Sequence, residues 1–161
     1  MAELVTVMDW RVNFPAEVEF AIESGDGREN VDENGVIHYY TEREGGSSVH
    51  WHELGHMIEN YNPSVEMANQ DFLQRRAKKD GSGQSITEPM NNLVPWGRYA
   101  ADEVAYMDRW HNPYVGKIYE DGGTEVTSMG LQALGSRPID LVKDPEHLAH
   151  TLATLLGEFN E

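Results

Sequence analysis

Two histidines and a glutamate lie within five consecutive residues, in the order His52-Glu53-Leu54-Gly55-His56. On a helix, residues four apart lie one turn above each other, so both imidazoles can reach one ion while Glu53 lies beside them. Neutral imidazole is a good zinc ligand, and zinc lowers the pKa of a bound water to about 7. Glu53 would accept the proton of that water as a general base. The spacing predicts a zinc-hydrolase site with His52 and His56 as ligands.

The residues around this motif favour the helix that the chemistry needs. Ser47 and Ser48 offer an N-cap, and Pro63 ends the helix. Gly55 is costly in a helix interior, so we expect another backbone to pass close to it. Apolar or motif residues form two stripes, one of Trp51, Leu54 and Ile58 and one of Val49, His52, Glu53, His56 and Met57. A helix covered on two sides is expected for a buried site.

A catalytic zinc usually has three protein ligands, so the two histidines need a partner. Glu59 rises roughly 10 Å beyond His52 on a straight helix, which is too far to share the ion. The metzincin pattern requires a histidine at the position of Asn62 and therefore fails. His147 and His150 lie near the carboxyl end among Leu148, Leu152 and Leu155, where a packing helix is the simpler interpretation. His111 remains open as a ligand or as a hydrogen-bond donor to a transition-state oxyanion.

Glu125 is the preferred third ligand. It follows Gly122-Gly123 at the start of a predicted helix, and Glu125-x-x-Ser128 resembles the second-helix motif Asn-Glu-x-x-Ser-Asp of thermolysin-type gluzincins. Thr124 replaces the Asn of that motif and Met129 replaces the Asp. The alternative is a glutamate placed in a first helical turn for its favourable interaction with the helix dipole.

The chain of 161 residues is long enough for one core and short for two, so we expect a single domain of α+β class. Residues 1–44 are rich in strand signals, with alternating apolar residues at 4–14 and 18–22 and a hairpin at Asn34-Gly35. His38 in the second hairpin strand is expected to be a packed side chain. Residues 45–161 carry the motif helix and further helices, expected at 65–79, 98–109, 124–134 and from 144 onward. Thr124 is expected to cap the third of these and Gly135 to close it. Residues 80–85 and 110–119 are expected to be loops, the latter an ordered loop or short strand.

Composition excludes several classes of function. A net charge of −16 disfavours a nucleic-acid partner. The chain has no cysteine, so any metal must be held by His, Asp or Glu. No apolar run reaches membrane-spanning length, and residues 1–10 lack the features of a secretion signal, which leaves the compartment open.

A longer series of segments resembles the zincin-like metallopeptidase domains of phage minor head and head-morphogenesis proteins and of polymorphic toxins. The resemblance spans about Gly45 to the end and rests on His52-Glu53-Leu54-Gly55-His56, Pro113-Tyr114-x-Gly116-Lys117-Ile118-Tyr119, Thr124-Glu125-Val126-x-Ser128-Met129-Gly130-Leu131 and Asp144-Pro145-Glu146. It implies a zincin-like fold, with a small, mostly antiparallel sheet packed on the active-site helix. It also implies a zinc-dependent peptidase, with Glu125 as third ligand and phage head or toxin components as partners.

The sequence supports a zinc metallopeptidase most strongly, with a protein or peptide as substrate. Zn²⁺ and Glu53 would activate water, and His111, Tyr114 or Tyr119 would hydrogen-bond the oxyanion. One alternative is a structural or interaction module of a phage or toxin, whose zinc site stabilises the fold without catalysis. Another is an acidic mimic or inhibitor that needs no metal.

Overall fold

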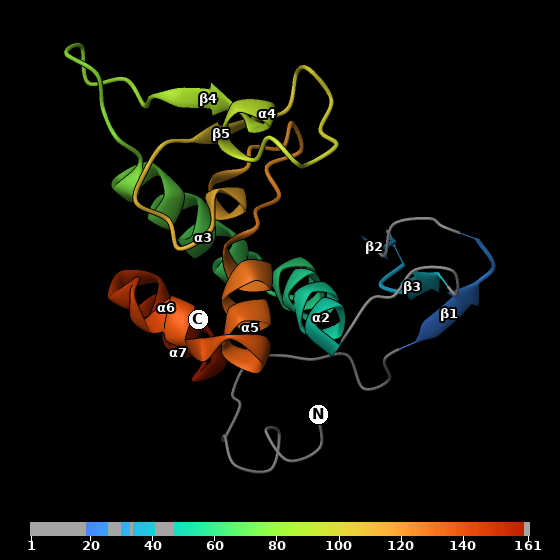
Figure 1. Cartoon of the computed structure of the whole chain (residues 1–161). Coiled ribbons are helices and arrows are strands. Elements are labelled where there is room, and N and C mark those ends of the chain that lie inside the picture. The colour runs from blue at the N-terminus through green and yellow to red at the C-terminus, as the bar shows by residue number, and fades with distance from the viewer. Residues whose placement is uncertain (1–18, 26–29, 33, 41–46, 160–161) are drawn as a thin grey trace.

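A computed structural model describes residues 19–25, 30–32, 34–40 and 47–159. In these ranges the chain is α+β, with six α-helices, one 3-10 helix and five short strands (Figure 1). The elements in order are β1 (Phe20–Glu23), β2 (Asn30–Val31), β3 (Ile37–Tyr40), α2 (Ser47–Tyr61), α3 (Pro63–Arg76), β4 (Thr87–Pro89), α4 (Met90–Leu93), β5 (Val104–Tyr106), η1 (Pro113–Gly116), α5 (Val126–Ser136), α6 (Pro138–Val142) and α7 (Pro145–Leu155). The strand predicted at residues 4–14 lies outside the described residues.

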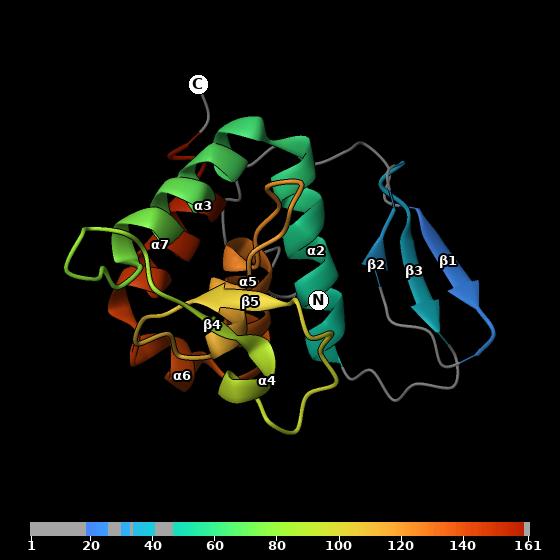
Figure 2. The same ribbon diagram turned by 90° about the horizontal axis from the view of Figure 1, so that it is seen from above.

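The amino-terminal sheet has the strand order β1-β3-β2 and lies on one side of α2 (Figures 1 and 2). β2 pairs antiparallel with β3, as the hairpin prediction requires. Gly35 adopts a φ of +80°, and the Asp32 carboxylate accepts hydrogen bonds from the backbone N–H groups of Asn34 and Val36. β1 pairs parallel with β3, so this sheet is mixed rather than mostly antiparallel. His38 lies on the central strand β3, near the carboxylates of Glu23 and Asp32, and not in the predicted metal site.

Helix α5 lies at the centre of the helical part, with α2 on one side and α6 and α7 on the other (Figure 1). The close approach of α2 and α5 depends on Gly55. An ideal Cβ at this position would lie 2.4 Å from Cα of Ser128, so the expectation of a nearby backbone is confirmed. Gly135 allows a second close contact between α5 and α2, because a Cβ at this position would meet the Trp51 ring. Gly135 therefore admits Trp51 and does not end the helix, which continues to Ser136.

Two clusters of buried apolar side chains fix the helices around α5. One apolar stripe of α2 lies in the first cluster, as expected, because Trp51 and Ile58 pack with Leu131 of α5 and Leu155 of α7. The second cluster joins α3 to β5, η1 and the start of α5 and consists of Phe72, Leu73, Met90, Ala105, Tyr114, Val115, Val126 and Met129. This second cluster holds η1 over the amino-terminal end of α5.

The helix expected at residues 98–109 is wrong. Residues Val104–Tyr106 form β5, which pairs antiparallel with β4, and Ala105 also forms a bridge with Lys117. Pairing on both edges of β5 satisfies backbone groups that a helix would have satisfied internally, so tertiary contacts override the local helix propensity. The aromatic segment expected as a loop or short strand instead contains the 3-10 helix η1, capped by the Asn112 side chain.

The other helical predictions are confirmed with shifted ends. α3 ends at Arg76 instead of Lys79, and α7 begins at Pro145 with Asp144 as its N-cap. Among the described residues, no helix is both long enough and apolar enough to cross a membrane.

Candidate metal centre

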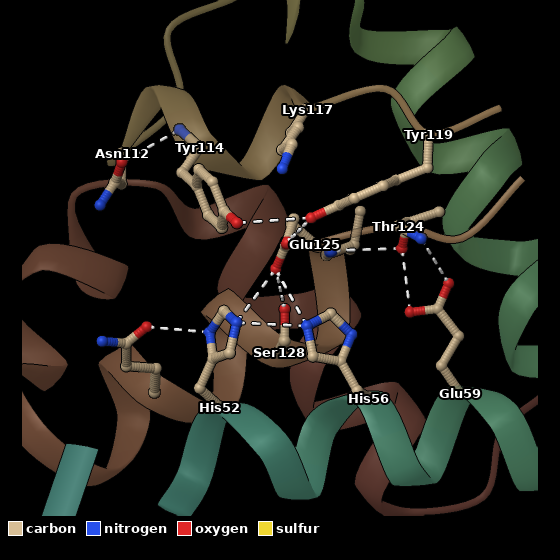
Figure 3. A network of polar contacts seen from close by, with 12 residues as sticks. His52, His56, Glu59, Asn112, Tyr114, Lys117, Tyr119, Thr124, Glu125 and Ser128 are labelled. Atoms are coloured by element: carbon tan, nitrogen blue, oxygen red, sulfur yellow. Dashed lines mark hydrogen bonds and ion pairs between the residues drawn. The ribbon is translucent and has the colours of Figure 1, made fainter. Parts of the chain in front are cut away.

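His52, His56 and Glu125 come together, although Glu125 is far along the chain from both histidines. The histidines rise from one face of α2, and Glu125 faces them from the start of α5 (Figure 3). Oε2 of Glu125 lies 3.3 Å from Nε2 of His52 and 3.3 Å from Nε2 of His56. The two Nε2 atoms are 3.2 Å apart. Three potential ligand atoms therefore form a nearly equilateral triangle.

The dimensions of this triangle match those of a zinc site. Zinc bonds to histidine nitrogen and carboxylate oxygen are about 2.0–2.2 Å long, and a tetrahedral ion with such bonds spaces its ligands about 3.3–3.4 Å apart. The measured separations of 3.2–3.3 Å agree with this value. The donor set of two imidazoles and one carboxylate leaves the fourth position of a tetrahedral ion to water, as in catalytic zinc sites. The residues therefore fit zinc.

Hydrogen bonds orient two of the three candidate ligands. Nδ1 of His52 lies 3.1 Å from the amide oxygen of Gln132, so that Nδ1 carries the proton and Nε2 presents its lone pair to the site. The hydroxyl of Ser128 donates to Oε2 of Glu125 over 2.7 Å, and the hydroxyl of Tyr119 donates to Oε1. Ser128 of the Glu125-x-x-Ser128 pattern thus supports the carboxylate, although Met129 replaces the Asp of the gluzincin motif. Gln132 was missed in the sequence, although it lies seven residues after Glu125 on the same face of α5.

The electrostatics of the centre favour a positive charge between the three groups. Burial raises the pKa of Glu125, which is 1% exposed, but the hydrogen bond from His56 and the charges of both histidines hold that pKa at about 2. Burial lowers the pKa of His56, and the hydrogen bond and charge of Glu125, with smaller contributions from Glu53 and Glu59, raise it above its ordinary value. The carboxylate stays ionised and both imidazoles face it, so the cluster attracts one cation, either a proton or a metal ion.

Glu53 borders the same space. Its side chain is 4% exposed and lines a cavity of about 910 Å³ that His52, His56 and Glu125 also line. Leu93, Val94 and Trp96 from the region of α4 line this cavity as well. The cavity is therefore large enough for a segment of a substrate, and polar and apolar side chains line it in similar measure.

The two tyrosines expected to stabilise an oxyanion lie together above Glu125 (Figure 3). The Tyr119 proton is directed to Glu125, which places Tyr119 as a support for the ligand. The Tyr114 hydroxyl lies 3.3 Å from that of Tyr119 and lines the cavity. The Lys117 ammonium lies 4.3 Å from the centre of the Tyr119 ring and forms an ion pair with Glu103 at 2.7 Å. Tyr114 thus reaches the cavity beside the hydroxyl that donates to Glu125.

Glu59 does not belong to the triangle, and its hydrogen bonds stabilise the segment before α5. Its carboxyl accepts hydrogen bonds from the backbone N–H and the hydroxyl of Thr124, at 3.0 and 3.1 Å. Thr124 was expected to cap α5, but the helix begins one residue later, with Glu125 at the capping position. Burial raises the pKa of Glu59 to about 7, against the lowering effect of Thr124. Glu59 therefore holds in place the segment that leads into Glu125.

The remaining histidines lie away from the triangle. His111 lines the large cavity, but its Nδ1 faces Nδ1 of His147 at 3.2 Å. His147 and His150 are buried in α7, as expected for a packing helix, and Nε2 of His150 lies 2.7 Å from the side-chain oxygen of Asn69. Burial lowers the pKa of His147 to about 4 and that of His150 to about 3. His111 is therefore not a third ligand beside His52 and His56.

Comparison of the chain with protein-family models, with curated proteins and with solved structures found no match. The functional assignment therefore depends on the geometry of the site.

Proposed function

We propose that this protein is a zinc-dependent metallopeptidase with a zincin-like fold. The observation that carries the proposal is the triangle of His52 Nε2, His56 Nε2 and Glu125 Oε2, with sides of 3.2–3.3 Å. Glu53 follows His52 directly and lines the same cavity, so a general base accompanies the three ligands. Two histidines and a carboxylate, with an adjacent glutamate, form the donor set of peptide-hydrolysing zinc sites.

Zinc, when bound, polarises the scissile carbonyl and lowers the pKa of the attacking water. Glu53 accepts the proton of that water as its oxygen forms a bond to the carbonyl carbon. The same carboxyl then delivers the proton to the amide nitrogen as the C–N bond breaks, which leaves a free carboxylate and a free amine. Tyr114 donates a hydrogen bond to the carbonyl oxygen as negative charge develops there.

The substitution Glu53→Gln tests this function. It keeps the size of the side chain and removes the base, so the variant should bind zinc as tightly as the unchanged protein and lose cleavage of an unstructured protein substrate. Loss of a general base typically reduces the rate by about 10²–10⁴-fold. Glu158→Gln is the matched control, because Glu158 is exposed near the carboxyl end and should leave cleavage unchanged.

Two results would contradict the proposal. Cleavage that survives both a chelator and Glu53→Gln excludes the mechanism. Zinc binding by the unchanged protein, with no cleavage of any unstructured substrate, favours instead a stabilising zinc site in a structural module.

A further inference from the structure

A second group of possible metal ligands lies apart from the triangle, where the loop before η1 meets the start of α7. It comprises His111 in the loop before η1, Asp144 at the N-cap of α7 and His147 in the first turn of α7. One ligand atom from each residue lies within 4.8 Å of the other two. Asp144 is 5% exposed and His147 is fully buried, so this group is held inside the protein.

A hydrogen bond determines which nitrogen of His147 carries a lone pair, and that nitrogen faces His111. Nε2 of His147 lies 2.8 Å from the carbonyl oxygen of Val126, so Nε2 donates its proton there and Nδ1 carries a lone pair. That lone pair points at Nδ1 of His111, 3.2 Å away. Without a metal ion, Nδ1–H of His111 donates to this lone pair, and Nε2 of His111 is buried with no hydrogen-bond partner among the described residues. Transfer of that proton to Nε2 breaks only the hydrogen bond to His147 and leaves Nδ1 of His111 free to bind a metal ion. The two Nδ1 atoms have the separation that a tetrahedral zinc ion imposes, about 3.3–3.4 Å.

Asp144 offers one carboxylate oxygen to the same space. Its Oδ1 accepts from Arg76 at 2.5 Å, whereas its Oδ2 has a long contact of 3.4 Å with the backbone N–H of His111. Arg76 also pairs with Asp108 at 2.6 Å and approaches Glu146 at 3.9 Å. Arg75 also pairs with the exposed Glu146 at 3.5 Å, so Arg76 mainly faces the two more buried carboxylates of Asp108 and Asp144. Two carboxylates against this one guanidinium leave a negative charge that favours a further cation.

We propose that His111 Nδ1, His147 Nδ1 and an Asp144 carboxylate oxygen form a second zinc site. We assign it a structural role, because Asp144 and His147 are buried and the three ligands join the loop that carries His111 to α7. Two imidazoles and a carboxylate suit zinc better than calcium or magnesium, which prefer oxygen ligands. The Val126 carbonyl and Arg76 orient His147 and Asp144, as outer-shell groups do in metal sites. Occupancy would fix the loop that leads into η1 and its Tyr114.

Counting zinc on the full chain tests this site independently of peptidase activity. The unchanged protein, dialysed against zinc and measured by elemental analysis, should hold two zinc ions per chain. His111→Gln should hold one, His52→Gln should also hold one, and the double variant none. His38→Gln is the matched control, since His38 lies on β3 of the amino-terminal sheet and belongs to neither group of ligands, and it should keep both ions.

Thermal unfolding gives a second readout, on a variant that retains only the second site. Added zinc should raise the Tm of His52→Gln, and this rise should disappear in the His52→Gln, His111→Gln double variant. A single zinc ion on the unchanged protein, lost with His52→Gln and kept with His111→Gln, would overturn the second site and leave the peptidase centre standing. Two zinc ions that both persist in His111→Gln would also overturn it. If His111→Gln does not fold, the zinc content of the unchanged protein and the Tm rise of His52→Gln decide the question.

Discussion

Replacement of Tyr119 by Phe tests whether Tyr119 supports the proposed ligand Glu125 or takes part directly in catalysis. The hydroxyl of Tyr119 donates to Oε1 of Glu125, and Ser128 donates to Oε2 of the same carboxylate. Tyr119→Phe keeps the ring, which lies 4.3 Å from the Lys117 ammonium, and removes one of these two donors. The carboxylate then keeps the hydrogen bond from Ser128 and loses the one from Tyr119.

The expected cost follows from the kind of hydrogen bond removed. A hydrogen bond to a charged group contributes about 1.5–3 kcal/mol, and each 1.4 kcal/mol corresponds to a tenfold change in an equilibrium constant. Loss of outer-shell partners of metal ligands typically weakens metal binding by about 10–100-fold. We therefore expect the zinc Kd of Tyr119→Phe to rise by about 10–100-fold. With zinc in excess, kcat should stay near that of the unchanged protein.

Competition with a fluorescent zinc chelator measures this Kd, and cleavage at saturating zinc measures kcat. Tyr106→Phe is the matched control, because the Tyr106 hydroxyl accepts a hydrogen bond from Gln74 and lies outside the metal centre. An unchanged zinc Kd, together with a large fall in kcat, would refute Tyr119 as a ligand support and restore it as an oxyanion donor.

Three further predictions concern the helices that hold the centre. Gln132→Leu should weaken zinc binding by about 10–100-fold in the same competition assay, because His52 loses the acceptor that fixes its tautomer; an unchanged affinity would exclude that role. Gly55→Ala should lower the free energy of unfolding in urea by about 1–3 kcal/mol, because its Cβ would lie 2.4 Å from Cα of Ser128, and a gain in stability would contradict the close approach. The zinc-free protein should lose about 3 kcal/mol of stability as the pH rises from 4.5 to about 7, because burial raises the pKa of Glu59 and the folded state favours its protonated form. Glu59→Gln should flatten this part of the pH profile in urea unfolding, and an equally steep profile would assign the loss to another group.

The three residues of the candidate metal centre could be predicted from the sequence because each has a local signal. The pair His52 and His56 depends on one helical turn, and helix geometry fixes the direction of both side chains from spacing alone. Glu125 could be chosen because glycines precede it and Ser128 follows it at the spacing of one turn. The structure brings these three residues together, and zinc binding itself stays a prediction.

The groups around the ligands could not be predicted from local pattern. The contact of Gln132 with His52 and that of Glu59 with Thr124 both join α2 to the segment around α5, and they depend on how the two helices pack. Gly55 indicated that another backbone passes close to α2. Only the fold shows that this backbone is the one at Ser128. Packing between helices thus determined the outer contacts of the site.

Short elements that depend on pairing were the least predictable. β5 consists of Val104, Ala105 and Tyr106 within a longer segment that was expected to be a helix, and its strand exists because β4 and Lys117 supply pairing partners. His111 illustrates the same limit for side chains. It lines the cavity, but the contact of its Nδ1 with His147, in a helix that follows much later in the chain, has no local signal in the sequence.

The metal centre is tested most directly by anomalous scattering at the zinc edge, from a crystal of the unchanged chain grown with zinc. We predict a peak about 2.0–2.2 Å from Nε2 of His52, from Nε2 of His56 and from a carboxylate oxygen of Glu125. No peak between these residues, or a peak that Glu125 does not contact, would contradict the proposed site.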